Sequence, residues 1–264
     1  MVTPNKNLGQ HWLKDEATLE AICEAANLTH EDTVLEIGPG LGDLTRQLIK
    51  RAGSVVAIEL DAELAASLST EIAADNLLIV RGNILEFDLA QLPAAYKVVA
   101  NIPYYLTSNL LRNLSESTNP PYEMTLLVQK EVAERISAKP GQMSLLATSV
   151  QLFYRPKLGP VVAAELFTPP PKVDSQVVIL QKRSKPLFPD LDTKLFFRIV
   201  KAGFAGRRKK LRGSLSAGLR IGKEQADALL RAAGIDGGRR AQELSLSEWH
   251  KLYKAYKSNN MELL

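Results

Sequence analysis

The sequence is poor in the residues that build disulfides, metal clusters and membrane spans. It has a single cysteine, Cys23, and three scattered histidines, His11, His30 and His250. One thiol cannot form an internal disulfide or a cysteine metal cluster, so we expect a reduced, cytoplasmic setting and no metal site. The sequence has no run of about 18 apolar residues, so we expect no membrane span. Its start also lacks the apolar core of a signal peptide, so we expect no cleaved leader.

Acidic residues dominate most of the chain, and basic residues concentrate in one later segment. Residues 1–180 contain 14 Lys/Arg and 21 Asp/Glu, a net charge of −7. Residues 181–223 contain 13 Lys/Arg and two acids, a net charge of +11. An acidic body with one strongly basic segment predicts a polyanionic partner such as a nucleic acid. The alternative is a solvated basic helix face.

Alternating strand and helix patterns predict the fold of the first two thirds. Short apolar runs indicate strands at 33–37, 54–60, 77–81, 97–100, 124–129 and 176–181. Helical spacing of apolar residues indicates helices at 15–27, 43–51, 62–73 and 131–138. This alternation is typical of an α/β fold in which helices cover both faces of a mostly parallel sheet.

The pattern changes near residue 186. Two prolines in the segment 185–189 indicate a linker. Beyond it the sequence predicts only helices, near 192–204, 206–217, 223–233 and 245–257. We therefore expect a Rossmann-like domain over residues 1–185 and a small all-helical, basic domain over residues 186–264.

The turn after the first strand of the sheet is rich in glycine, with Gly38, Gly40 and Gly42. Glycine lets the backbone pass close to a ligand, and in an open α/β sheet this turn lies at the ligand-binding edge. A dinucleotide fingerprint would have glycine where this sequence has Asp43, which argues against a pyrophosphate ligand and a dehydrogenase. Glu59, at the tip of the second strand, is placed to accept the ribose hydroxyls of a nucleoside.

Polar residues also follow the third and fourth strands. Asn83 is placed to meet the adenine of a nucleoside cofactor, and the alternative is that it caps the following turn. Asn101, Ile102, Pro103 and Tyr104 match the [D/N/S]-P-P-[Y/F] tetrad of methyltransferases that modify amino groups. We expect the Asn101 side-chain carbonyl and the Pro103 backbone carbonyl to accept hydrogen bonds from the target amine. We expect Tyr104 to stack on the target base.

With the tetrad placed, residues 5–257 resemble the KsgA/RsmA family of small-subunit ribosomal RNA adenine dimethyltransferases. Five further segments carry the resemblance: LGQHWL at 8–13, EIGPGLG at 36–42, QKEVAER at 129–135, FTPPPKVDS at 167–175 and FAGRRKKL at 204–211. The corresponding family patterns are L/F-G-Q-N-F-L, E-I-G-P-G-x-G, Q-K-E-V-A-x-R, F-x-P-P-P-K-V-D-S and F-x-x-R-R-K-x-L. This sequence departs from the family at His11, which replaces Asn, at Asn83, which replaces an acid, and at Ile102 and Tyr105.

The resemblance implies an S-adenosylmethionine-dependent enzyme that places two methyl groups on N6 of each of two adjacent adenosines. These adenosines lie in the 3′-terminal hairpin of small-subunit ribosomal RNA, so the expected partner is an immature small ribosomal subunit. The implied cofactor site comprises His11, Leu13, Gly38, Gly40, Glu59, Asn83 and Asn101. Phe167 is expected against the target base, and the alternative is a core phenylalanine before a proline turn. RNA phosphates are expected at Arg207, Arg208, Lys209, Lys210 and Arg212, and the protein is expected to be a monomer.

Two other functions are compatible with parts of the sequence. An Erm-type enzyme, which methylates adenine in large-subunit RNA, shares the tetrad but usually has Pro-Lys-Pro-Lys-Val-Asn where this sequence has PPPKVD at 169–174. A non-catalytic RNA-binding or assembly protein on the same scaffold would be favoured by loss of Asn101, Glu59 or the glycine turn. All of these are present, which favours the enzyme.

Overall fold

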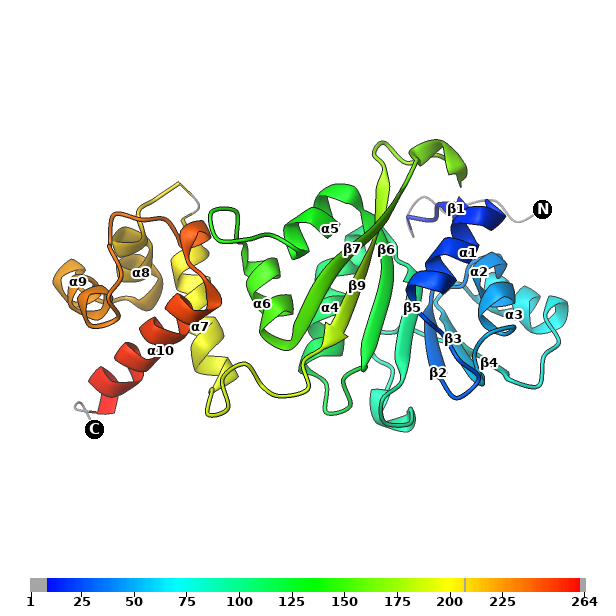
Figure 1. Ribbon diagram of the computed structural model, residues 1–264, viewed down its shortest axis with the longest axis horizontal. Coiled ribbons are helices and arrows are strands. Elements are labelled where there is room, and N and C mark those ends of the chain that lie inside the picture. The colour runs from blue at the N-terminus through cyan, green and yellow to red at the C-terminus, as the bar shows by residue number, and fades with distance from the viewer. Residues whose placement is uncertain (1–8, 207, 262–264) are drawn as a thin grey trace. The chain divides into compact units, whose positions relative to one another are not determined.

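The structure is a computed structural model that describes residues 9–206 and 208–261 (Figure 1). Leu8 and Arg207, which belong to two of the family motifs, lie outside the described residues. By the packing of its elements the chain divides into two compact units, Met1–Glu134 with Tyr154–Lys182 and Arg135–Phe153 with Arg183–Leu264. Each unit has its own secondary structure and core.

Within the described residues, the first unit contains a seven-stranded sheet in the order β4-β3-β2-β5-β6-β9-β7. The strands are β2 (Thr33–Ile37), β3 (Ser54–Glu59), β4 (Leu77–Arg81), β5 (Lys97–Asn101), β6 (Glu123–Gln129), β7 (Tyr154–Val162) and β9 (Ser175–Lys182). The five strands from β4 to β6 are parallel, and β9 is antiparallel to both of its neighbours. The strand order reverses at β2, and such a switch point opens a ligand site at the carboxyl ends of the strands.

Helices pack against this sheet. They are α1 (Glu16–Ala25), α2 (Asp43–Leu48), α3 (Ala62–Glu71) and α4 (Thr107–Glu116), with short 3-10 turns η2 (Leu89–Gln91), η3 (Tyr104–Leu106) and η4 (Ala164–Leu166). Helix α5 (Lys130–Ile136) begins in the first unit and ends in the second. One core cluster joins Cys23 of α1 and Leu48 of α2 to Val34, Val55 and Val99 on the sheet. The neighbouring strand residues that point to the other face, such as Leu35 and Val98, are also buried. Both faces are therefore covered, as parallel sheets require.

A small second sheet ties the start of the described chain to the proline-rich segment. Strand β1 (Trp12–Leu13) pairs antiparallel with β8 (Phe167–Thr168), with Trp12 opposite Thr168 and Leu13 opposite Phe167. Two motifs that are more than 150 residues apart in the sequence thus lie side by side.

The second unit is helical. Its helices are α6 (Leu145–Phe153), α7 (Thr193–Phe204), α8 (Leu211–Leu219), α9 (Lys223–Ala232) and α10 (Leu246–Met261), with the 3-10 turn η5 (Ala241–Glu243). Their core contains Phe196 and Trp249, both fully buried. Leu152 of α6 belongs to the same core, which differs from the domain boundary predicted at residue 186. The buried members that share this core with Leu152 begin at Phe196, more than 40 residues later in the chain, so local sequence patterns did not indicate that residues 145–153 join the helical unit.

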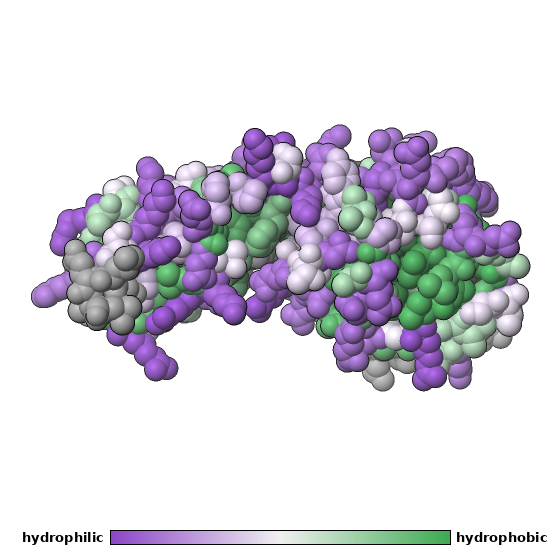
Figure 2. All heavy atoms as spheres, turned by 90° about the horizontal axis from the view of Figure 1, so that it is seen from below, coloured by the Kyte–Doolittle hydropathy of each residue, from purple (hydrophilic) through white to green (hydrophobic). Residues whose placement is uncertain are grey.

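The predicted fold class, a Rossmann-like sheet with a C-terminal helical region, is confirmed by the sheet order and the helical second unit. Helix α8 begins at Leu211 rather than 206, because Lys210 is in extended conformation with φ −64° and ψ 148°. On the face shown in Figure 2 most side chains are hydrophilic, and a hydrophobic area lies over the first unit. No described helix is long and apolar enough to cross a membrane, and no group of His, Cys, Asp or Glu among the described residues is arranged to hold a metal ion.

Candidate active site

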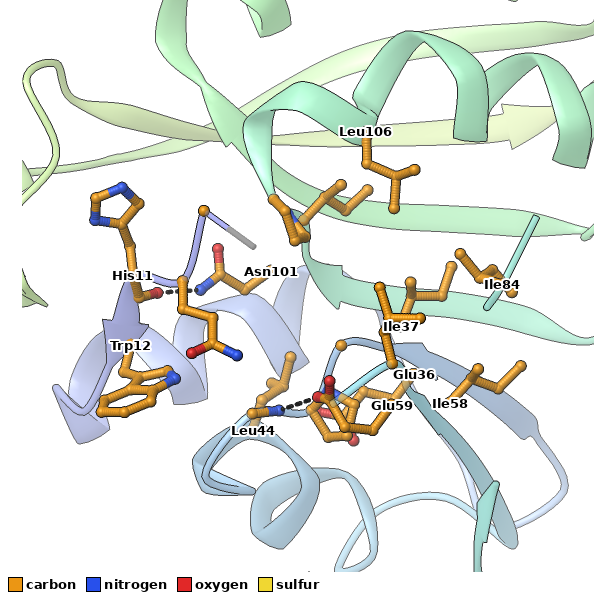
Figure 3. Close-up of a pocket in the computed structure, with 18 of the residues that line it drawn as sticks. His11, Trp12, Glu36, Ile37, Leu44, Ile58, Glu59, Ile84, Asn101 and Leu106 are labelled. Atoms are coloured by element: carbon orange, nitrogen blue, oxygen red, sulfur yellow. Dashed lines mark hydrogen bonds between the residues drawn. The ribbon is translucent and has the colours of Figure 1, made fainter. Parts of the chain in front are cut away.

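A cavity of about 250 Å³ lies at the carboxyl ends of β2, β3, β4 and β5 (Figure 3). Its walls come from five separate stretches of the first unit, 9–13, 36–44, 58–60, 82–85 and 101–106, together with Leu19. These stretches bring together nine of the residues predicted from the sequence, namely His11, Leu13, Gly38, Gly40, Glu59, Asn83, Asn101, Pro103 and Tyr104. The sheet topology explains this convergence, because parallel strands present all their carboxyl ends at one edge.

Glu59 ends strand β3 and holds the glycine turn in place. One carboxylate oxygen accepts a hydrogen bond from the N–H of Gly40 at 3.0 Å, and the other accepts from the N–H of Asp61 at 2.9 Å. Burial raises the pKa of the Glu59 carboxyl above its usual range, and these two hydrogen bonds oppose the shift. Each carboxylate oxygen has a further lone pair, so Glu59 retains the capacity to accept ribose hydroxyls.

Glu36 is a site residue that sequence reasoning missed. It lines the cavity and is only 1% exposed, and no described residue forms a hydrogen bond with either carboxylate oxygen. Burial raises the pKa of Glu36 to about 8, while the Thr45 hydroxyl, which lies nearby but outside hydrogen-bonding geometry, partly opposes the shift. Burial therefore favours the protonated carboxyl at neutral pH. The available signal was an acid at the inner end of an otherwise apolar strand.

The side-chain amide of Asn101 is oriented by the N-terminal segment. Its nitrogen donates a hydrogen bond to the backbone carbonyl of His11 at 3.1 Å (Figure 3). An amide nitrogen only donates and an amide oxygen only accepts, so this contact fixes which end of the side chain is which. No described residue donates to the Asn101 oxygen, which is therefore left as a free acceptor at the cavity.

The backbone of the tetrad offers two acceptors, the predicted Pro103 carbonyl and the Ile102 carbonyl. The Pro103 carbonyl already accepts a hydrogen bond from the Leu106 N–H at 2.9 Å. The Ile102 N–H donates to the Leu127 carbonyl at 3.2 Å, and no described residue donates to the Ile102 carbonyl. The Ile102 carbonyl is therefore a free acceptor among the described residues, and an acceptor role of the Pro103 carbonyl, through its second lone pair, stays a prediction. The sequence could not show this, because the outcome depends on the 3-10 turn that follows Pro103.

His11 points toward the tetrad and the proline-rich segment. Its Nδ1 donates a hydrogen bond to the Pro169 carbonyl at 2.7 Å. Its ring stacks on Tyr104 with centroids 5.7 Å apart and an interplanar angle of 24°. The Tyr104 hydroxyl is in turn hydrogen-bonded to the Ser175 hydroxyl at 2.9 Å. Figure 3 shows the imidazole directed away from Glu36 and Glu59. A contact between His11 and the cofactor stays a prediction.

Asn83 caps the turn after β4. Its side-chain oxygen accepts from the Leu85 N–H at 3.1 Å, and its nitrogen donates to the Glu86 carboxylate at 3.0 Å. This is the turn-capping role that the sequence left open as the alternative. The predicted contact with adenine would use the second lone pair of the oxygen or the second hydrogen of the nitrogen.

Phe167 is not brought to the cavity. Its side chain is 2% exposed and belongs to the core cluster that contains Leu13, Val162 and Val177. The structure therefore places it as the core phenylalanine of the alternative interpretation. Stacking on a target base stays a prediction, and it would require the ring to move or to gain an exposed face.

The described residues among the predicted phosphate contacts lie in the second unit, in the turn between α7 and α8 and at the start of α8. Arg208, Lys209, Lys210 and Arg212 are all exposed. Arg212 forms an ion pair with Asp227 at 3.1 Å. Within the described part of the chain, no acidic side chain pairs with Arg208, Lys209 or Lys210. Three cationic side chains are thus available to an external anion.

Comparisons with known proteins identify the family. The model of the family described as "Ribosomal RNA adenine dimethylase" matches residues 1–258. A protein of Dehalococcoides mccartyi named "Ribosomal RNA small subunit methyltransferase A" is 43% identical over 258 residues, which cover 96% of this chain and 89% of that protein. A Clostridium botulinum protein of the same name is 41% identical over 254 residues, covering 94% of this chain and 92% of the relative.

Two solved structures share the fold over nearly the whole chain. A dimethyladenosine transferase from Plasmodium falciparum has a TM-score of 0.81 and 25% identity, covering 95% of this chain and 98% of that one. The 23S rRNA methyltransferase ErmE has a TM-score of 0.72 and 29% identity, and the match covers 93% of this chain and 99% of ErmE. The chain therefore belongs to the ribosomal RNA adenine dimethylase family. The family resemblance and the methyltransferase activity predicted from the sequence are confirmed.

Proposed function

We propose that this enzyme dimethylates N6 of two adjacent adenosines in the 3′-terminal hairpin of small-subunit ribosomal RNA, with S-adenosylmethionine as the methyl donor bound in the cavity described above. The observation that carries the proposal is the Asn101 amide. Its nitrogen is held by the His11 carbonyl, and its oxygen is a free acceptor where the four strand ends meet. The names of the curated relatives support the small-subunit substrate.

The residues of the cavity fit the methyl donor. The Trp12 indole nitrogen and both Glu36 carboxyl oxygens are buried polar atoms without hydrogen-bond partners among residues 9–206 and 208–261, in a cavity whose walls are otherwise largely apolar. A ligand with a nucleoside and a zwitterionic amino-acid end offers donors and acceptors for such atoms. We assign the ribose hydroxyls to Glu59, the adenine edge to Asn83, and the remaining wall to Gly38, Gly40, His11 and Leu13. When bound, S-adenosylmethionine supplies a methyl group on a sulfonium, which is a good leaving group.

The tetrad makes the target amine reactive by hydrogen bonding. The lone pair of an adenine amine is delocalised into the ring, which makes the nitrogen a poor nucleophile. The Asn101 side-chain oxygen and the Ile102 carbonyl accept hydrogen bonds from its two N–H groups and draw the nitrogen toward tetrahedral geometry. Once the methyl group has been transferred, the nitrogen loses a proton to water. Neither group has to remove a proton first, so Asn101 acts by position rather than as a base. Holding two reactants in register can contribute roughly 7–11 kcal/mol to such a reaction.

The base must leave its stack to reach these acceptors, as other base-modifying enzymes require. Tyr104 is the aromatic that we assign to the extruded base. Its ring is held on one side by His11 and at its hydroxyl by Ser175, so it is ordered before the substrate arrives. Base–aromatic stacking contributes about 1–3 kcal/mol per base.

Arg208, Lys209, Lys210 and Arg212 are the residues that we assign to RNA phosphates, together with Arg207 from the sequence. Phosphate contacts position an RNA without reading its sequence. We expect the protein to be a monomer. We also expect a cytoplasmic location, in agreement with the single buried thiol, which cannot form an internal disulfide.

An assay of both ribosomal subunits tests the proposed substrate. Labelled S-adenosylmethionine and the protein are incubated with small or large ribosomal subunits that lack adenine methylation. We expect label in the small subunit only. Label in the large subunit would identify an enzyme of the ErmE type. Binding to small subunits without any transfer of label would instead favour an assembly protein that has kept the scaffold.

A further inference from the structure

Trp12 lies directly on the glycine turn of the cavity. Its backbone is fixed by the pairing of β1 with β8, where it lies opposite Thr168. Its Cδ1 and Nε1 atoms both lie 3.3 Å from the position that a Cβ atom on Gly40 would occupy. Gly40 has a φ of +61°, which favours glycine, and the absence of a side chain there lets the indole approach the backbone. Figure 3 shows the indole at the cavity wall with its nitrogen on the inner side.

The indole N–H has no partner in the part of the chain that the structure describes. Nε1 is buried, and no described residue accepts a hydrogen bond from it. An indole nitrogen only donates, so a nearby donor cannot satisfy it. A buried polar group without a partner is costly, and native proteins contain few of them. Because this one faces a ligand cavity, an acceptor on a bound ligand is the natural partner.

The glycine turn itself offers a bound anion few donors. The N–H of Gly38 donates to the Ile58 carbonyl at 2.9 Å, that of Gly42 to the Pro39 carbonyl at 2.9 Å, and that of Gly40 to Glu59 at 3.0 Å. Glycine turns that bind phosphates leave such N–H groups free for the ligand. Here most of them maintain the turn, so an anionic group in this cavity needs a donor from another element.

We propose that the Trp12 indole N–H donates a hydrogen bond to the carboxylate at the amino-acid end of the methyl donor, an inference that rests on the proposed cofactor site. The donor's ammonium and adenine amine carry hydrogens and cannot accept from an N–H. Its ribose hydroxyls are assigned to Glu59, and its adenine edge, with the accepting ring nitrogens, is assigned to Asn83. The carboxylate remains as the charged acceptor, and hydrogen bonds to charged acceptors are shorter and stronger than neutral ones.

The test uses Trp12→Phe in the full-length protein. Phenylalanine is the residue in the family pattern at this position, so it keeps an aromatic ring on Gly40 and removes only the N–H and the second ring. The ligands are S-adenosylhomocysteine, which has the amino-acid end, and 5′-methylthioadenosine, which lacks it. Calorimetric titration should show that Trp12→Phe binds S-adenosylhomocysteine about tenfold more weakly than the parent, or about 1.4 kcal/mol. The two proteins should bind 5′-methylthioadenosine equally well.

The outcomes separate this contact from packing and from the cofactor site itself. Equal affinity of parent and variant for S-adenosylhomocysteine would mean that the N–H forms no hydrogen bond with the ligand, and the inference would be wrong. An equal loss for both ligands would show that the indole acts through packing, which also overturns it. A parent protein that binds neither ligand would refute the proposed cofactor site and this inference together. Thermal melting of both proteins confirms that the variant is folded.

Discussion

At the scale of single residues, the most informative side chain is Asn101. Its nitrogen is committed to the His11 carbonyl, so its oxygen is the end that we propose for the target amine. We expect Asn101→Ala to lower turnover at least ~100-fold, comparable to the loss of one preorganised hydrogen-bonding group. RNA affinity should barely change, because this group is one of many that touch the RNA.

A second Asn101 variant tests the orientation. Asn101→Asp keeps an acceptor but loses the donor to His11, so the side chain is no longer held and the carboxylate faces a carbonyl. We expect its turnover to lie between those of the parent and Asn101→Ala. Steady-state methyl transfer on small subunits gives the turnover of the parent and both variants, and a filter-binding measurement gives their RNA affinity. Turnover at the parent level in Asn101→Ala would remove Asn101 from the mechanism.

Glu36 predicts a pH dependence of stability. Its pKa rises from 4.5 to about 8 on folding, because burial disfavours the charged form. Between these pH values the unfolded chain releases a proton that the folded protein keeps. The contribution to stability is therefore fully present below the unfolded pKa and is lost as the pH rises through 8, with a slope of up to about 1.4 kcal/mol per pH unit.

Glu36→Gln removes this titration while keeping the shape of the side chain. We expect the variant to lose less stability than the parent between pH 5 and pH 8. Urea unfolding of both proteins at several pH values measures how the free energy of unfolding depends on pH. The pKa of Glu59 is also raised, but Glu59 is present in both proteins, so its contribution cancels in the comparison. If the free energy of unfolding depends on pH in the same way in both proteins, Glu36 is not buried in its neutral form.

At the scale of elements, the pairing of β1 with β8 decides how Phe167 is interpreted. The ring is buried in the core together with Leu13, the residue opposite it in the small sheet. We expect Phe167→Ala to lower stability by about 3–5 kcal/mol, as for other buried phenylalanines. Phe167→Leu should keep most of that stability and should also keep activity per folded molecule if the ring only packs.

The same pair of variants tests the base-stacking alternative. If Phe167→Leu is folded but transfers methyl groups much more slowly than the parent, the ring contacts the target base and the core interpretation is incomplete. Thermal melting and single-turnover methyl transfer, measured on the same preparations, distinguish the two results.

The turn between α7 and α8 carries the proposed phosphate contacts. Replacing Arg208, Lys209 and Lys210 together with Gln should weaken RNA binding and reduce the salt dependence of affinity, by about 0.7–0.9 in slope for each phosphate that is no longer neutralised. Turnover at saturating RNA should change less. Arg212→Gln is the matched control, because Arg212 already pairs with Asp227 and should contribute less. An unchanged salt slope in the triple variant would refute the role of this turn.

Sequence patterns predicted some elements well and others poorly, for physical reasons. Strands β2 and β4 have the predicted bounds, because each is a short apolar run between turns. Strand β7 was not predicted, since Pro156, Gly159 and Pro160 resemble a loop. It lies at the edge of the sheet, where proline is tolerated because one side of the strand needs no hydrogen-bond donors. Helix α4 was also not predicted, because its three buried leucines are set among polar residues.

At the scale of the whole molecule, local patterns were sufficient to find the site but not to assign each role in it. The carboxyl ends of parallel strands must converge, so the glycine turn, Glu59, Asn83 and Asn101 could be placed together from the sequence. The hydrogen-bond and packing partners of individual atoms could not be predicted from the sequence. The capping contacts of Asn83, the engaged carbonyl of Pro103 and the burial of Phe167 depend on turns and pairings that only the folded chain defines.

The division of charge also belongs to this scale. The acidic residues lie mainly in the part of the chain that forms the catalytic unit, and the basic segment lies almost entirely in the helical unit. We therefore assign chemistry to the first unit and much of the RNA affinity to the second.

The central claim is tested most directly by mapping the methylated bases. Unmethylated small ribosomal subunits are treated with the protein and S-adenosylmethionine, and mass spectrometry of nuclease fragments locates the added methyl groups. The account predicts that two adjacent adenosines in the 3′-terminal hairpin each gain two methyl groups with the parent protein, and that Asn101→Ala adds almost none in the same time. Methylation at any other position, or normal methylation by Asn101→Ala, would contradict it.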